Sequence, residues 1–164
     1  MYQVYSVKTN QGGRPYQQDR MLIKEFKDKS MYVIFDGHGA AGGDIAEFLK
    51  VTLQNHLDSK DNIEEVSDKQ LVTSCFHQME LALRQSSLDC YMSGSTCSMV
   101  VVNSTGNITV GYIGDSSILL CKKTESQYEV RYASKSHNCD DPEERIRIEG
   151  NGGRVDRTDP RNFN

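Results

Sequence analysis

The chain has 164 residues and carries 19 lysines and arginines against 23 aspartates and glutamates, which gives a formal net charge of −4. This length fits one domain, so we expect a single domain over residues 1–164 with one functional site. The acidic balance supplies no basic surface for nucleic acid, and no window is apolar enough to span a bilayer. Neither nucleic acid nor a membrane is an expected partner. With no signal-peptide layout at the start, the sequence favours a protein of the cytoplasm or the nucleus.

The first third of the chain predicts extended segments. Residues 2–8 alternate loosely, and residues 21–26 form a second extended stretch, which suggests antiparallel neighbours. The apolar run MYVIF at residues 31–35 is typical of a strand buried on both faces. We expect this strand to stop at the polar segment that begins with Asp36.

Helical periodicity follows these strands. Apolar residues three and four apart predict an amphipathic helix from Asp44 to Leu57 and another from about Ser67 to Ser87, where Ser67 or Asp68 can cap the first turn. Four short β-rich stretches, separated by turn residues, then predict a meander. Their ranges are residues 96–102, 108–113, 117–122 and 128–133.

The C-terminal part predicts one more helix. Pro142 follows Asp141 at a position that suits the first turn of a helix, and the glycines from Gly150 to Gly153 would end it. The order of strands, two helices, strands and a helix argues for an α+β fold built in layers, and against a parallel βαβ repeat.

The five cysteines contain no Cys-x-x-Cys pair, so we interpret them as reduced thiols and not as zinc ligands. Cys97 and Cys121 lie in apolar runs. We expect both to pack as small hydrophobic residues.

Two apolar segments each end in an aspartate beside a glycine, Asp36 in MYVIFDGHG and Asp115 in ITVGYIGDSS. Strand ends in one sheet can converge, and converging carboxylates repel each other unless a divalent cation lies between them. Oxygen ligands without thiolates select Mg²⁺ or Mn²⁺ ahead of zinc or copper, and the Gly37 carbonyl could reach the same ion. The alternative is a simple hairpin turn at Asp36–Gly37, and this motif alone does not decide between the two.

Two further side chains could act beside such an ion. His38 could transfer a proton near neutral pH, although a surface histidine is the simpler interpretation of that residue alone. Arg14 lies five residues before Asp19, and its guanidinium has the planar geometry that binds phosphate, with a solvated loop arginine as the alternative. For the glycine-rich segment 39–43 we expect a plain turn, because it lacks the lysine and spacing of a P-loop.

Five separate segments carry a combined signal: GGRPYQQD, YVIFDGHGAAGG, SGSTCSMVVV, ITVGYIGDSS and DDPEERIRIEGNGGRV. In this order they resemble the metal-dependent protein phosphatases of the PPM type, the protein phosphatase 2C class. The resemblance extends across nearly all of the chain. It implies a sandwich of two antiparallel β-sheets flanked by helices, and hydrolysis of phosphoserine and phosphothreonine in phosphorylated proteins by a metal-activated water.

The resemblance also implies the metal ligands. Two ions, Mg²⁺ or Mn²⁺, would be bridged by Asp36, and the Gly37 carbonyl would join one of them. Asp19 would hold metal-bound water, and Asp115 would serve an additional, weaker ion. Gln18 would be a neutral ligand to metal-bound water at a position where many relatives carry Glu.

The same resemblance implies that Arg14 clamps the substrate phosphate and that His38 protonates the leaving alkoxide. One further departure is Ser117, which replaces a common Arg after Gly-Asp-Ser. Both this change and Gln18 are expected to weaken metal binding without abolishing it.

The largest departure is that the family continues past the Gly-Gly-Arg-Val region into strands that supply two more metal aspartates. The resemblance therefore implies that the chain is the N-terminal part of a catalytic domain, that its sandwich is incomplete, and that it has little or no phosphatase activity by itself. Exposed sheet edges and apolar surface of a half sandwich predict association through those edges, or aggregation.

Two other functions stay open at this stage. The chain could be a pseudophosphatase, a regulatory module that binds phosphoproteins through Arg14 without a full metal site. It could also be an unrelated α+β interaction domain in which the Asp-Gly pairs are only turns.

Overall fold

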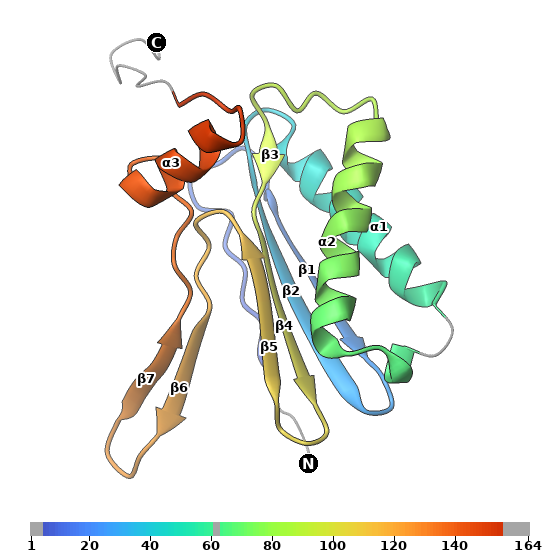
Figure 1. Ribbon diagram of the computed structural model, residues 1–164, viewed down its shortest axis with the longest axis vertical. Helices are drawn as coiled ribbons and strands as arrows, with labels where there is room; N and C mark the ends of the chain where they lie inside the picture. Colours follow the sequence, from blue (N-terminus) through green and yellow to red (C-terminus); the bar gives the residue numbers. More distant parts are fainter. Residues whose placement is uncertain (1–4, 61–62, 156–164) are drawn as a thin grey trace.

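The computed structural model describes residues 5–60 and 63–155, and Figure 1 shows a main sheet with two helices on one of its faces. The strands are β1 (Asp19–Glu25), β2 (Lys29–His38), β3 (Gly94–Ser95), β4 (Cys97–Asn103), β5 (Ile108–Ile113), β6 (Leu119–Lys123) and β7 (Tyr128–Ala133). The helices are α1 (Gly42–Asp58), α2 (Asp68–Gln85) and α3 (Pro142–Gly150), with a 3-10 turn at Ile63–Glu65. The expected α+β class is confirmed.

The main sheet has the strand order β1-β2-β4-β5, with every pair antiparallel, and β3 pairs with the end of β2. Along β2, Met31, Val33 and Phe35 are buried beneath the helices, whereas Ile34 between them is 55% exposed. The expectation of a strand buried on both faces is therefore wrong. Helices cover one face of the sheet only, so β2 alternates as a half-buried strand does.

Helices α1 and α2 pack the apolar faces that the sequence pattern predicted against the main sheet. Ser67 caps α2, and its hydroxyl accepts a hydrogen bond from the backbone N–H of Gln70. Asp141 caps α3 in the same way, through the backbone N–H of Glu143. The core residues from α1 and α2 are Ile45, Ala46, Leu49, Leu53, Leu57, Leu71, Val72, Cys75 and Met79.

A second, two-stranded antiparallel sheet is formed by β6 and β7, which Figure 1 shows as a hairpin that extends away from the main sheet. Its side chains are largely exposed, including Tyr128 and Val130. Cys121 lies on this hairpin and is exposed, so the expectation that it packs as a buried hydrophobe is wrong. Cys97 is buried as expected, and burial raises the pKa of its thiol to about 12.

Two expectations about the N-terminal half need correction. Residues 5–8 form no strand, while residues 2–4 of that predicted segment lie outside the described part of the chain. The strand through residues 31–35 does not stop at Asp36 either, and no hairpin turn occurs there. Pairing with β3 extends β2 through Gly37 to His38. The interpretation of Asp36–Gly37 as a turn is thereby excluded.

The sheet face opposite the helices carries exposed apolar side chains, as expected for part of a sandwich. Ile34 and Ile108 are examples within the described residues. Association through this surface or through sheet edges stays a prediction. None of the helices in the described ranges has the length and apolar composition needed to cross a bilayer.

A buried lysine fixes the beginning of β2 to α2. The side chain of Lys29 is only 3% exposed, and its Nζ lies 3.2 Å from a carboxylate oxygen of Asp68, the first residue of α2. The same ammonium donates to the Val66 carbonyl at 3.0 Å, and Asn103 at the end of β4 donates to the second Asp68 oxygen at 2.9 Å. These contacts hold α2, the residue that follows the 3-10 turn and two strands together at one end of the sheet.

We expect Lys29→Met to lower the free energy of unfolding by about 3 kcal/mol, because methionine keeps the aliphatic stem but leaves Asp68 without its cation in a largely buried position. Urea unfolding measures the change. Lys27→Met, at an exposed position in the turn just before β2, is the matched control and should shift stability by less than about 0.5 kcal/mol. Equal losses in the two variants would contradict this role.

Candidate active site

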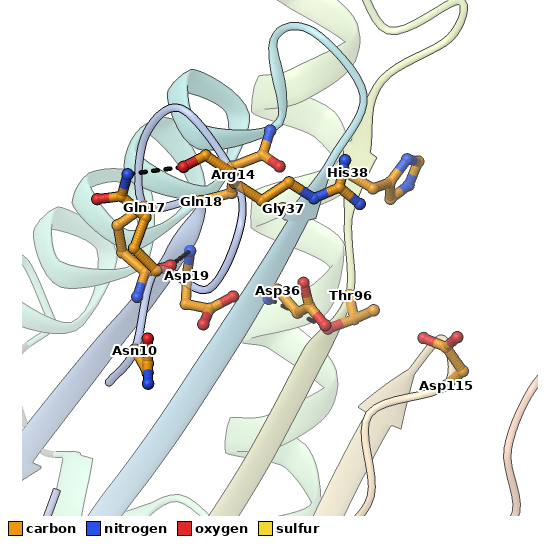
Figure 2. A pocket seen from close by; sticks show the side chains of 11 residues that line it. Asn10, Arg14, Gln17, Gln18, Asp19, Asp36, Gly37, His38, Thr96 and Asp115 are labelled. Atoms are coloured by element: carbon orange, nitrogen blue, oxygen red, sulfur yellow. Dashed lines mark hydrogen bonds between the residues drawn. The ribbon is translucent and has the colours of Figure 1, made fainter. Parts of the chain in front are cut away.

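The carboxylates of Asp19 and Asp36 come together across the β1–β2 pair. Asp19 is the first residue of β1, and the antiparallel register places it directly opposite Asp36. Both lie on the face away from the helices, because the flanking residues Phe35 and Gly37 are buried on the other face. Figure 2 shows the two side chains next to each other at the ends of their strands. The register thus unites two of the aspartates that the sequence singled out.

Three carboxyl groups, those of Asp19, Asp36 and Asp115, concentrate negative charge in this region. The pKa of Asp36 is raised from its ordinary value of 3.8, first by burial and then by the charges of Asp19 and Asp115 and a hydrogen bond with the Asp19 carboxyl, while nearby His38 acts in the opposite direction. Among the described residues, no lysine or arginine forms an ion pair with any of these three aspartates. A bound cation would relieve this repulsion.

Thr96 connects Asp36 to the loop that carries Asp115. Its hydroxyl oxygen accepts a hydrogen bond from the Asp36 backbone N–H at 3.2 Å, and its own backbone N–H donates to the Asp36 carbonyl at 2.9 Å. The hydroxyl also lies 2.8 Å from that of Ser116. Because the Thr96 oxygen already accepts from Asp36, its hydrogen remains available for Ser116. Thr96 therefore fixes Asp36 relative to the Asp115 loop.

Gly37 and Gln18 hold the turn between β2 and α1. A Cβ on Gly37 would lie 2.3 Å from the carbonyl oxygen of Gly42 and 2.8 Å from that of Gln18, so close packing requires glycine. The side-chain amide of Gln18 is largely buried and donates to the Gly39 carbonyl at 2.7 Å. These contacts are structural. The roles of Gly37 and Gln18 as metal or water ligands stay predictions.

One cavity of about 350 Å³ unites the predicted site. Arg14 reaches it from the N-terminal loop, where its carbonyl accepts a hydrogen bond from the Gln11 side chain at 2.7 Å. His38 reaches it from the end of β2. In the view of Figure 2, the side chains of Arg14 and His38 lie above the paired carboxylates. The seven predicted site residues all line this cavity: Arg14, Gln18, Asp19, Asp36, Gly37, His38 and Asp115.

The described residues fit a divalent cation only in part. Residues 5–60 and 63–155 contain no group of three or more His, Cys, Asp or Glu side chains that could hold a metal ion together. Asp19 and Asp36 supply oxygen ligands of the kind that Mg²⁺ and Mn²⁺ prefer, but Mg²⁺ takes an octahedral shell of about six ligands. The pair is therefore an incomplete ligand set.

Comparison with known sequences decides the family. The sequence matches the profile of the family described as Protein phosphatase 2C over residues 5–164. The chain belongs to the protein phosphatase 2C family.

Curated protein phosphatase 2C relatives are similar across most of the chain. The chain is 27% identical over 166 residues to "Probable protein phosphatase 2C 2" of Paramecium tetraurelia, and the alignment covers 93% of this chain and 53% of that protein. It is 31% identical over 137 residues to "Integrin-linked kinase-associated serine/threonine phosphatase 2C" of Bos taurus, and that alignment covers 77% of this chain and 36% of that protein. The chain thus spans about half, or less, of the length of these relatives.

Solved structures support the protein phosphatase 2C fold. A sex-determining protein of C. elegans superposes with a TM-score of 0.60 at 21% identity, over 90% of this chain and 38% of that one. A PPM Ser-Thr phosphatase of Mycobacterium smegmatis, solved in complex with cacodylate, superposes with a TM-score of 0.57 at 21% identity, over 84% of this chain and 53% of that one. These likenesses support the architecture alone.

Sequence reasoning missed Thr96 as part of the site. Its segment, SGSTCSMVVV, indicates by itself only a family motif and the beginning of a β-rich stretch. The hydroxyl becomes informative only when β4 lies beside β2, because the contacts to Asp36 and Ser116 span 60 and 20 residues of sequence. A polar residue at the end of a strand next to the Asp36 strand would have been the available signal.

We expect Asp36→Asn to raise the thermal midpoint at about pH 7 in the absence of divalent cations. Folding raises the pKa of Asp36, so the folded state favours the protonated carboxyl group. The stability that this preference contributes is fully present below the unfolded pKa and is lost as the pH rises through the folded pKa, where the carboxylate ionises. Asparagine does not ionise and avoids this loss. The gain should stay below about 1 kcal/mol, since solvent screens this partly exposed group, and it should vanish near pH 3.

Thermal unfolding across this pH range measures the effect. Glu125→Gln removes an exposed carboxylate from the turn between β6 and β7 and should show no comparable gain. If Asp36→Asn were less stable than the wild type at about pH 7, carboxylate repulsion would not be the dominant interaction at this position.

Proposed function

We propose that this chain supplies the N-terminal part of the active site of a Mg²⁺- or Mn²⁺-dependent phosphatase that hydrolyses phosphoserine and phosphothreonine in proteins. The observation that carries the proposal is the register of Asp19 opposite Asp36, which creates an uncompensated carboxylate pair in the same cavity as Arg14 and His38. Membership of the protein phosphatase 2C family supports the reaction class.

Arg14 is assigned to the substrate phosphate. It enters the cavity from a loop, and its guanidinium can donate two parallel hydrogen bonds to phosphoryl oxygens. No carboxylate among the described residues forms an ion pair with Arg14, so its donors are available to an anion. The carboxylates that line the same cavity would repel that anion in the absence of a cation. Phosphate binding by Arg14 therefore also requires a bound cation.

His38 is assigned to the leaving group. An imidazolium in this position donates its proton to the serine or threonine oxygen as the bond from that oxygen to phosphorus breaks, so that an alcohol and not an alkoxide departs. His38 lines the same cavity as Asp19 and Asp36, and this shared lining supports the assignment.

Asp36 is assigned to hold two divalent cations with help from the Gly37 carbonyl, and Asp19 and Gln18 to hold metal-bound water. Asp115 is assigned to a third, weaker ion. When bound, such ions lower the pKa of the attacking water and neutralise the phosphoryl oxygens. The chain spans about half the length of curated relatives, and we propose that the remaining ligands come from outside the described residues. By itself the chain should have little or no phosphatase activity.

Calorimetry with Mn²⁺ tests the metal part of the proposal. The wild-type chain should bind Mn²⁺, and Asp36→Asn should bind it at least about tenfold more weakly, since even indirect ligand contacts contribute that much. Glu125→Gln should bind as the wild type does. Equal binding by wild type and Asp36→Asn, or none by either, would contradict the metal assignment.

Binding of a phosphoserine peptide separates the functional alternatives. Under the proposal, peptide binding weakens in Arg14→Ala and depends on Mn²⁺. Binding that depends on Arg14 but not on metal would indicate a phosphoprotein-binding module. Steady turnover of the peptide by the 164-residue chain with Mn²⁺ would contradict the expectation that it is inactive alone.

A further inference from the structure

Strand β3 pairs antiparallel with the last residues of β2, the part of that strand that carries His38. Gly37 pairs with Ser95, and His38 pairs with Gly94. Two other contacts fix this short strand to the same stretch. The Ala41 backbone N–H donates to the Ser93 hydroxyl at 3.0 Å, and Thr96 bonds Asp36 immediately after β3.

The space at Gly94 is occupied by the His38 ring. A Cβ built on Gly94 would lie 2.7 Å from Nε2 and 3.1 Å from Cε1 of His38, and its three nearest neighbours all belong to that ring. Real Cβ atoms do not approach other atoms this closely. An alanine at position 94 would therefore require the imidazole to move.

The backbone gives no other reason for glycine at position 94. Its φ lies outside the left-handed region, so any residue could adopt its conformation. Gly39 differs, because its φ is +79° and an added Cβ would lie 2.2 Å from the Met92 carbonyl oxygen. At Gly37 the obstacle is likewise backbone. At Gly94 it is only the end of a side chain that can rotate away.

We propose that Gly94 is a positioning residue for His38. Its missing side chain lets the imidazole lie against the β3 backbone, and β3 is itself bonded to Asp36. The location of Nε2 relative to the carboxylates is thus set by strand pairing and not by the His38 rotamer alone. The catalytic meaning of this position rests on the proposed function of His38 as the proton donor.

NMR spectroscopy of the 164-residue chain tests the placement. In the wild type, the His38 ring protons should give nuclear Overhauser contacts to the Gly94 α-protons. In Gly94→Ala these ring contacts should be lost or replaced, and the His38 ring resonances should shift, while those of His56 and His77 stay in place. Unchanged His38 ring resonances in Gly94→Ala would overturn the proposal.

Two further variants separate displacement of the ring from damage to the fold. Gly150→Ala, where nothing lies within 4 Å of an added Cβ, should leave the His38 signals unchanged. The double variant Gly94→Ala/His38→Ala should fold as well as His38→Ala, because the ring that excludes the Cβ is gone. A misfolded double variant beside a folded His38→Ala would also overturn the proposal. Neither readout needs catalytic turnover, so a failure of the proposed phosphatase function would leave this test intact.

Discussion

The antiparallel register of β1 and β2 is the constraint on which the site depends. It places the first residue of β1, Asp19, directly across from Asp36, on the sheet face that the helices leave open. A shift of one residue in either strand would turn one of the two carboxylates toward the helices. The buried alternate residues of β2, such as Val33 and Phe35, oppose that shift because it would expose them. Core packing beneath the sheet therefore determines carboxylate placement above it.

The surrounding contacts extend this placement to the rest of the cavity. Thr96 forms hydrogen bonds with the backbone N–H and the carbonyl of Asp36, and its hydroxyl contacts Ser116 in the loop after β5. The position of that loop is therefore tied to the end of β2. Gly37 permits close approach of the beginning of α1, and Gly94 permits close approach of the His38 ring. Main-chain pairing and small residues thus bring carboxylates, a guanidinium and an imidazole to one end of the sheet. Membership of the protein phosphatase 2C family is the context for the function proposed for this cavity.

Local patterns predicted the elements well, whereas contacts distant in sequence were missed. Two strands that depend on neighbouring residues were predicted correctly, Ile108–Ile113 and Tyr128–Ala133. Of the two candidate caps for α2, Ser67 and Asp68, the structure selects Ser67. The extension of β2 to His38 depends on pairing with β3, whose residues lie 56 and 58 positions further along the chain than their partners. The expectation that the strand stops at Asp36 was therefore wrong. The same distance hid the contacts of Thr96. Burial on one face only could not be read from MYVIF, because the run does not specify which layers cover it.

We expect a cation to bind at the Asp19–Asp36 pair, and paramagnetic Mn²⁺ locates it most directly. In amide NMR spectra, substoichiometric Mn²⁺ should broaden signals from residues 18–19 and 36–38 first, and signals around Asp115 next. Signals from the β6–β7 hairpin should stay sharp. Broadening centred on another acidic region, such as the beginning of α3, or no selective broadening at all, would contradict the claim that strand register builds a metal-binding carboxylate pair.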